Sequence, residues 1–319
     1  MSSMWAPPCR SGKPSTLHPC GGRPFGGKDG LHQPHSPKSS LKPWTPQKGL
    51  ETEFYNDRKE RIYQEIVQDF QTGNTRITDR PQDVKLASAV SFSFFVKHAS
   101  LSPERLVHIY DIAGEVFTNN DENEVQQQYE YCQGIVFILD PFAIPEVRFQ
   151  YEELLSPEDL AGYGRADLND VIDSFLNKLR EVTGLSDSSM STVPLAVVIS
   201  KIDSAGLDQD VGRRAVEKLM KAQPQVFTDF FNTQDYLCRK FLRENGMESF
   251  LNNISLQFKT TAFLPAAPFG HSRGKGPYRP EGVLPPMEWL IQNADPKLGQ
   301  LWGEHVFPKK PISAGPAQY

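Results

Sequence analysis

Apolar residues along this chain follow two different periods, and each period predicts one kind of secondary structure. Residues 89–98 and 105–111 have the composition of strands and are joined by a short polar link, which predicts an antiparallel hairpin. Residues 134–140 and 194–200 are apolar runs of the kind that parallel strands show when helices cover both faces of the sheet. A last strand is expected at residues 256–263. The pattern predicts a mostly parallel sheet with an antiparallel edge.

Helical spacing appears between these strands. The strongest case is residues 167–182, where Leu168, Phe175 and Leu179 fall on one face. An amphipathic helix is also expected between Phe54 and Phe70. The remaining helical patterns lie at residues 121–133, 207–222, 226–244, 247–254 and 286–292. Alternating strands and helices indicate an α/β domain with three layers.

The ends of the chain differ in composition from its centre. Residues 1–48 are dense in Pro, Gly and Ser and lack apolar runs, so we expect a disordered leader. Residues 49–294 form the expected folded domain, and residues 295–319, which include Pro308, Pro311 and Pro316, are expected to be a flexible tail. The first 50 residues carry a net charge of +6, which leaves −11 for the rest of the chain. An acidic body argues against nucleic acid as a partner.

Composition narrows the class of protein further. The chain has 319 residues, and none of its apolar runs reaches the roughly 18 residues that a membrane-spanning helix needs. Its first residues lack the apolar core of a signal peptide, so we expect a cytoplasmic protein without a membrane partner. The four cysteines are scattered, which favours reduced thiols over a disulfide framework or a zinc site.

Three aspartates follow the carboxyl ends of predicted strands. The strand at 105–111 ends in Asp111 within the string D-I-A-G-E, the next ends at Asp140, and S-K-I-D places Asp203 after the third. Ligands of open parallel sheets bind beyond these strand ends. We therefore expect one shared site at this edge of the sheet.

Asp203 is the most specific of these candidates. Its carboxylate could accept two hydrogen bonds from guanine N1 and N2, which adenine cannot donate. Lys201 would then lie along the plane of the base, and Ser200 stands beside it. The alternative is that Asp203 and Ser204 simply form a turn or a helix cap.

These motifs together resemble Ras-like P-loop GTPases, and most closely the bacterial double-GTPase group. The resemblance implies that Asp111 holds Mg²⁺, that the backbone of Gly114 meets the γ-phosphate of GTP, and that Glu115 takes the place of the water-orienting catalytic residue. It also implies that Thr78 or Thr75 completes the magnesium shell. In the same way, Thr261 and Ala262 would contact guanine O6.

The phosphate-binding loop of that family is missing from the sequence. The nearest string, at residues 10–16 (RSGKPST), has Pro14 where the magnesium-binding hydroxyl belongs, and no apolar strand precedes it. We therefore expect the first strand and the P-loop to be absent, either because the start of the chain was wrongly defined or because the chain is a degenerate relative.

The sequence therefore predicts a guanine-nucleotide-binding switch domain with weak or no hydrolysis of GTP. The alternative is a pseudo-GTPase that serves as an interaction module for a partner protein. A third interpretation, an ATP-using P-loop enzyme, is disfavoured by Asp203, because adenine lacks the donor pair that this carboxylate suits.

Overall fold

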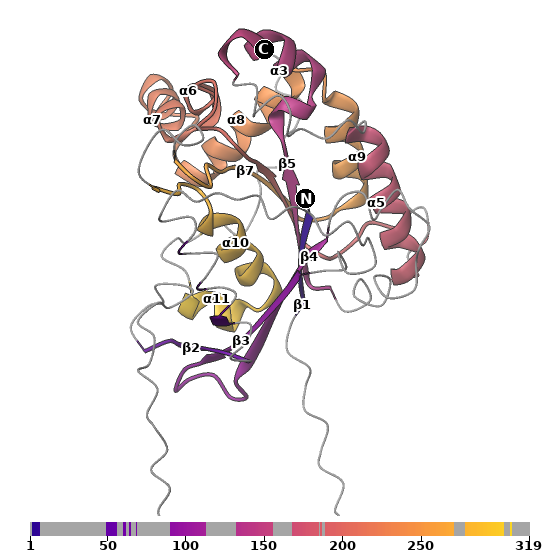
Figure 1. The fold of residues 1–319 in the computed structure, drawn as a ribbon, viewed down its shortest axis with the longest axis vertical. Helices are drawn as coiled ribbons and strands as arrows, with labels where there is room; N and C mark the ends of the chain where they lie inside the picture. Colours follow the sequence, from indigo (N-terminus) through magenta and orange to yellow (C-terminus); the bar gives the residue numbers. More distant parts are fainter. Residues whose placement is uncertain are drawn as a thin grey trace, which may run out of the picture.

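A mixed seven-stranded sheet forms the centre of the molecule, with the strand order β2-β3-β4-β1-β5-β6-β7 (Figure 1). The computed structural model describes residues 2–6, 49–55, 60–61, 64, 68, 90–112, 132–155, 168–184, 186, 189–270, 278–302 and 307. The α/β class expected from the sequence is confirmed. The parallel strands and the antiparallel hairpin are confirmed too, but four of the six strand pairings in the described residues are antiparallel, so the expectation of a mostly parallel sheet is wrong.

Three parallel strands make one half of the sheet, which we call the parallel half. They are β5 (Gly134–Leu139), β6 (Leu195–Ile199) and β7 (Thr261–Pro265). Every residue of β6 is buried, as is every residue of β5 except Ile138. Burial on both faces explains why these strands appear in the sequence as unbroken apolar runs.

Three antiparallel strands make the other half, which we call the antiparallel half. They are β2 (Glu51–Phe54), β3 (Val90–Lys97) and β4 (Arg105–Ile112). The β3–β4 hairpin is the one that the sequence predicts. Phe54 lies in β2, so the helix expected from that residue begins later, and the described residues 60, 61, 64 and 68 are helical.

A short strand, β1 (Ser2–Ala6), joins the two halves. It pairs antiparallel with both β4 and β5, which therefore run in the same direction. The expectation that the sheet lacks its central strand is therefore wrong. Ser2–Ala6 supplies hydrogen-bond partners for backbone groups of β4 and β5, and without such partners these groups would be costly to bury. The other residues of the expected disordered leader, including 10–16, lie outside the described residues.

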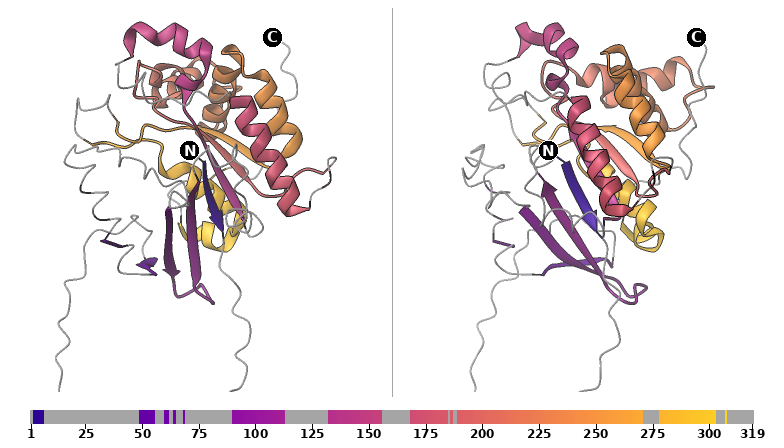
Figure 2. Two further views of the ribbon diagram at one scale, coloured as in Figure 1. Left: turned by 45° about the vertical axis from the view of Figure 1, so that its right-hand side comes forward. Right: turned by 90° about the vertical axis from the view of Figure 1, so that its right-hand side faces the viewer.

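Helices cover both faces of the sheet. On one face α5 (Leu168–Thr183) and α9 (Glu248–Gln257) lie side by side, and on the other face α10 (Leu284–Ala294) is followed by α11 (Pro296–Trp302) (Figure 1 and Figure 2). Alternate residues of β5 point to these two layers. Phe137 contacts the rings of Phe175 and Phe250, whereas Val136 belongs to the cluster that contains Trp289 of α10.

Further helices surround the parallel half. They are η2 (Pro141–Ala143), α3 (Pro145–Tyr151), η3 (Glu152–Leu154), α6 (Asp208–Val211), α7 (Arg213–Ala222) and α8 (Phe230–Glu244). The single helix predicted at 207–222 is thus divided at Gly212. A Cβ atom there would overlap the carbonyl oxygen of Asp208, so this change of direction requires glycine. The helix predicted at 121–133 lies outside the described residues, apart from its last two positions.

Part of the expected tail is a packed helix. Leu298 and Trp302 of α11 are buried against Phe94 of the hairpin in one apolar cluster. The sequence does not predict this helix. Its buried residues lie just before the proline-rich residues 308–316, and the composition of that segment dominates the whole expected tail. Residues 308–319 lie outside the described residues.

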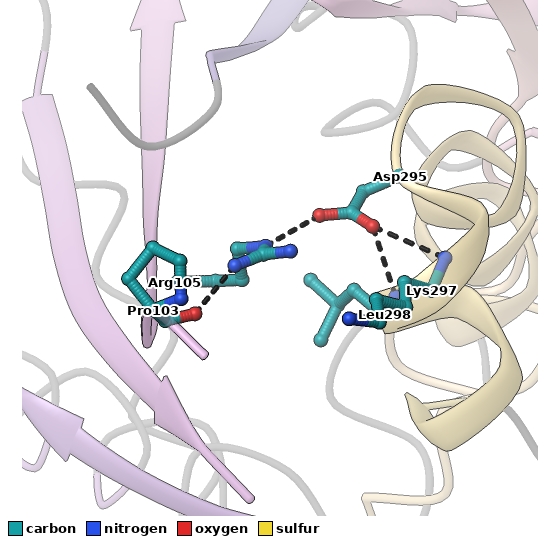
Figure 3. A network of polar contacts seen from close by, with 5 residues as sticks. All are labelled: Pro103, Arg105, Asp295, Lys297 and Leu298. Atoms are coloured by element: carbon teal, nitrogen blue, oxygen red, sulfur yellow. Dashed lines mark hydrogen bonds and ion pairs between the residues drawn. The ribbon is translucent and has the colours of Figure 1, made fainter. Parts of the chain in front are cut away.

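An ion pair fastens α11 to the hairpin (Figure 3). The Nε of Arg105 donates to Oδ2 of Asp295 at 2.6 Å, and Arg105 also donates to the carbonyl oxygen of Pro103. The other oxygen of Asp295 accepts the backbone N–H groups of Lys297 and Leu298 at 3.1 and 3.0 Å. Asp295 therefore caps the helix and pairs with the strand at once.

Candidate functional site

The carboxyl ends of the three parallel strands meet at one edge of the sheet. Leu139, Ile199 and Pro265 are aligned in the register of β5, β6 and β7. The next residues along each strand, Asp140 and Ser200 among them, therefore stand side by side. This edge gathers the predicted S-K-I-D residues, as the sequence implied.

Asp140 binds two partners at this edge. Its Oδ2 lies 2.5 Å from Nζ of Lys201, and its Oδ1 accepts the backbone N–H of Phe142 at 3.0 Å. The second bond caps η2 directly after β5. The ion pair links the end of β5 to the loop after β6, a contact that the sequence did not reveal.

Hydrogen bonds from the backbone and from the Ser200 side chain hold the loop that carries S-K-I-D. Ser200 Oγ donates to the carbonyl oxygen of Leu139 at 3.0 Å, and Ile202 N–H donates to the carbonyl oxygen of Ala266 at 3.3 Å. Ser204 N–H closes a turn on Lys201 at 2.9 Å. The loop is thus tied to both neighbouring strands.

Asp203 lies in this turn, partly exposed, with one carboxylate oxygen buried. The N-cap position of the following helix, α6, is held by Leu207, which makes no side-chain capping bond. On either side of it, Lys201 and Ala205 adopt φ angles of 55° and 54°, a left-handed conformation that is uncommon outside glycine. Strained backbone of this kind often accompanies functional sites.

Asp111 lies on the antiparallel side of the same edge. It is the penultimate residue of β4 and pairs with Ser3 of β1, which in turn pairs with Val136 of β5. Strands are spaced about 4.8 Å apart and rise about 3.3 Å per residue, so the Cα atoms of Asp111 and Asp140 are separated by roughly 16 Å. Only an extended ligand could touch both. Gly114, Glu115, Thr75 and Thr78 lie outside the described residues.

Thr261 and Ala262 do not lie at the carboxyl end of the last strand, where the sequence placed them. They begin β7, pair with Leu195 and Ala196, and so lie at the opposite edge of the sheet. Thr261 Oγ1 accepts Nη2 of Arg239 at 3.0 Å, which is a structural bond to α8. The error arose because α9 continues to Gln257, so the strand expected at 256–263 starts later than its apolar pattern suggests.

Ala266 and Ala267 occupy the edge position that sequence reasoning assigned to Thr261 and Ala262. The N–H of Ala266 donates to Ile199 at 2.8 Å, and its carbonyl oxygen accepts from Ile202. The N–H of Ala267 donates to the carbonyl oxygen of Glu281 at 2.8 Å. The sequence signal that could have identified Ala266 and Ala267 is a pair of small residues directly after an apolar strand.

Neither a metal-ligating cluster nor the end of β1 lies at the described part of this edge. In the part of the chain that the structure describes, no group of three or more His, Cys, Asp or Glu side chains is placed to hold a metal. The chain leaves β1 after Trp5 and Ala6, and Trp5 pairs with Gly134, the first residue of β5, at the edge opposite Asp140. A phosphate-binding loop directly after β1 would therefore lie on the wrong side of the sheet.

A pocket of about 260 Å³ lies behind this edge, among α3, α6 and α8. Across it, the hydroxyl of Tyr151 donates to Oδ2 of Asp210 at 2.9 Å. Partial burial, with the hydrogen bond to Asp210 and the charge of that carboxylate, raises the pKa of Tyr151 to about 12. The pocket is also lined by Lys240, Glu244 and Asn245.

Comparison of the chain with known protein families, curated proteins and solved structures found no match. None of the helices in the described ranges combines the length and apolar character needed to cross a bilayer.

Proposed function

We propose that this chain is a GTPase-like domain that binds guanine nucleotides weakly at the carboxyl edge of its parallel half and does not hydrolyse them. The strand order carries the proposal. In Ras-like domains the first strand lies between the third and fourth, and here β1 lies between β4 and β5 with the hairpin on one side and S-K-I-D on the other. The reversed direction of β1 departs from that pattern.

In this proposal Asp203 accepts the N1 and N2 donors of guanine, and the stem of Lys201 covers the base. A carboxylate at this position discriminates between bases, because guanine can donate its N1 and N2 hydrogens to it and adenine offers no such donor pair. Asp111 would face the phosphates and their Mg²⁺, with Thr78 as a second candidate ligand. One or two protein oxygens leave most of the octahedral magnesium shell to water and phosphate.

Weak binding without turnover follows from what the edge lacks. Catalysis of phosphoryl transfer depends on positioning and on neutralising charge around the phosphates. At the described edge the ammonium group of Lys201 is already paired with Asp140. The sequence offers no intact phosphate loop to supply further donors, so Glu115 would have no positioned phosphate to act on.

The second candidate is a non-catalytic interaction module, a pseudo-GTPase that binds a partner protein. The observation in its favour is that polar groups of S-K-I-D are satisfied within the chain. Ser200 donates to Leu139, and Lys201 pairs with Asp140. A loop closed in this way needs no nucleotide to be stable.

Thermal melting with GTP, GDP and ATP separates the two candidates. At ten times its Kd, a nucleotide that binds only the folded protein stabilises it by about 1.4 kcal/mol. We expect GTP and GDP to raise the melting temperature and ATP to have little effect. If no nucleotide changes it, the interaction module is the better description. Magnesium-dependent GTP turnover at ordinary GTPase rates would contradict the claim of no hydrolysis.

The variant Asp203→Asn tests the base contact directly. It should weaken GTP at least about tenfold and shift preference toward xanthine nucleotides, whose C2 carbonyl can accept from the new amide. Glu217→Gln, on an exposed face of α7, makes the same change of charge and should leave nucleotide binding unaltered. An unchanged ratio of GTP to XTP affinity in Asp203→Asn would remove the guanine assignment.

A further inference from the structure

The two oxygens of Asp140 serve different parts of the molecule. Oδ1 caps η2 through the backbone N–H of Phe142, whereas Oδ2 holds the ammonium group of Lys201 across the strand boundary. The side chains of Asp140 and Lys201 are 22% and 35% exposed, so the pair is only partly open to solvent. A charge-assisted bond of 2.5 Å in such a setting is stronger than a typical surface ion pair.

Lys201 needs such a restraint, because its backbone is left-handed. A φ of 55° brings the Cβ atom of a non-glycine residue close to its own backbone and costs free energy. Ala205, four positions later, has the same conformation. Left-handed residues of this kind persist only where surrounding contacts hold them.

The contacts that hold the turn containing Asp203 include three made by Lys201, Ile202 and Ser204. Ser204 N–H bonds back to Lys201, Ile202 N–H bonds to Ala266, and the side chain of Lys201 reaches Asp140. The first two are backbone bonds that any sequence could make. The ion pair with Asp140 is the one side-chain restraint among the three, and it acts on the strained residue itself.

We propose that Asp140 is a positioning residue, which anchors Lys201 in its left-handed conformation and so fixes the orientation of Asp203. The consequence of this anchoring for ligand choice rests on the proposed function. With the loop held, the Asp203 carboxylate faces guanine in one orientation and discriminates against adenine. Without the anchor, the turn relaxes and this discrimination falls.

Asp140→Asn separates the two roles of the residue. The amide oxygen of Asn can still accept the N–H of Phe142, but its NH₂ group would face the ammonium group of Lys201 with a donor instead of an acceptor. Lys201→Asn removes the same ion pair from the other side and keeps a residue that tolerates left-handed backbone. Glu217→Gln, which removes the exposed pair with Arg213, is the matched control.

Two measurements test the proposal on the full chain. Hydrogen exchange of the amides of Ile202 and Ser204, without nucleotide, reports whether the turn is held. The ratio of GTP to ATP affinity reports selectivity, which a general loss of stability would leave unchanged. We expect Asp140→Asn to speed exchange at both amides and to lower the GTP to ATP ratio at least about fivefold. Lys201→Asn should change both in the same direction but by less, because Asn is less strained in the left-handed conformation, and the double variant should add little to Asp140→Asn, because both changes break one interaction.

The outcomes separate this proposal from the proposed function. If exchange of the turn in Asp140→Asn and Lys201→Asn matches the parent, the anchoring role is overturned whatever nucleotide binds. If exchange rises but the GTP to ATP ratio holds, the specificity role is overturned. If the parent shows no preference for GTP over ATP but the turn exchanges faster in the variants, the proposed function and the specificity role are both overturned. The anchoring role is supported in that case. If Asp140→Asn does not fold, Lys201→Asn decides.

Discussion

The parallel and antiparallel halves of the sheet differ in how far their strands are buried and in where they carry polar side chains. In the parallel half, β5 and β6 are buried on both faces and carry no charged side chain along their lengths. In the antiparallel half, polar side chains occur within the strands, as where Ser93 Oγ and His108 Nδ1 lie 2.7 Å apart across the hairpin. Strands such as β5 and β6, which have no polar side chains inside them, can place chemistry only at their ends. The candidate site lies at such an end.

The two halves also differ in what they pack against. The parallel half is covered by long helices on one face and by α10 on the other, and its strands pack into the largest apolar cluster. The antiparallel half rests on a smaller cluster, in which Phe94 contacts the rings of Phe54 and Trp302. We therefore expect the parallel half to dominate the free energy of unfolding.

Replacing a core phenylalanine in each half tests this comparison. Phe137→Ala should lower the free energy of unfolding by about 4 kcal/mol, because two neighbouring rings from α5 and α9 cannot close the cavity. Phe94→Ala should cost about 3 kcal/mol, since α11 can move toward the gap. Urea denaturation measures both. Phe149→Ala is the control, as this side chain is 85% exposed and should change stability by less than about 0.5 kcal/mol. A larger loss for Phe94→Ala would reverse the comparison.

The ion pair between Arg105 and Asp295 stabilises the packing of α11 against the antiparallel half. Asp295→Ala should cost about 2 kcal/mol, because it removes both the cap of α11 and the partner of a mostly buried guanidinium group. Asp295→Asn should cost less, because its amide oxygen can still accept the N–H of Leu298. Equal losses for the two variants would show that the charge, and not the cap, matters.

The same residue predicts a dependence on pH. Burial favours the neutral form of Asp295, but the hydrogen bonds from Arg105 and Leu298 favour the carboxylate, and the net effect is to lower the pKa of Asp295 from 3.8. The stabilisation is therefore present above that ordinary value and is lost as the pH falls through the lower folded pKa. The difference in melting temperature between the parent and Asp295→Asn should shrink below about pH 4. A difference that is constant down to pH 2 would contradict this.

The smallest expected effect belongs to Tyr151 at the margin of the parallel half. Tyr151→Phe should cost about 0.5 kcal/mol, because Asp210 is exposed and water can replace the lost donor. The pKa of Tyr151, raised from 10.0 to about 12, means that the bond is intact below pH 10 and is lost as the pH rises through about 12. In a spectrophotometric titration of the folded protein, one late-titrating tyrosine should disappear in Tyr151→Phe.

Local patterns could be predicted from the sequence, and long-range pairings could not. The helix expected at 167–182 is observed as Leu168–Thr183, because helical periodicity is a property of neighbouring residues. β1 was missed because Ser-Ser-Met-Trp-Ala has little pattern of its own and becomes a strand only between β4 and β5.

The candidate site divides in the same way. Ser200, Lys201 and Asp203 could be placed after β6 because a strand end is visible in the sequence. Thr261 was misplaced because a shift of a few residues along a strand carries a side chain from one edge of the sheet toward the other. The pairing of Asp140 with Lys201 depends on strand register, which no single segment encodes.

The position of β1 has a consequence for the order in which the sheet forms. Its partners in β4 and β5 lie more than 100 residues away along the chain, whereas β3 and β4 are joined by a short turn. Contacts between distant residues require long loops to close first, and they form late in folding. We expect the hairpin and the parallel strands with their helices to form as separate nuclei, which the arrival of β1 then joins into one sheet.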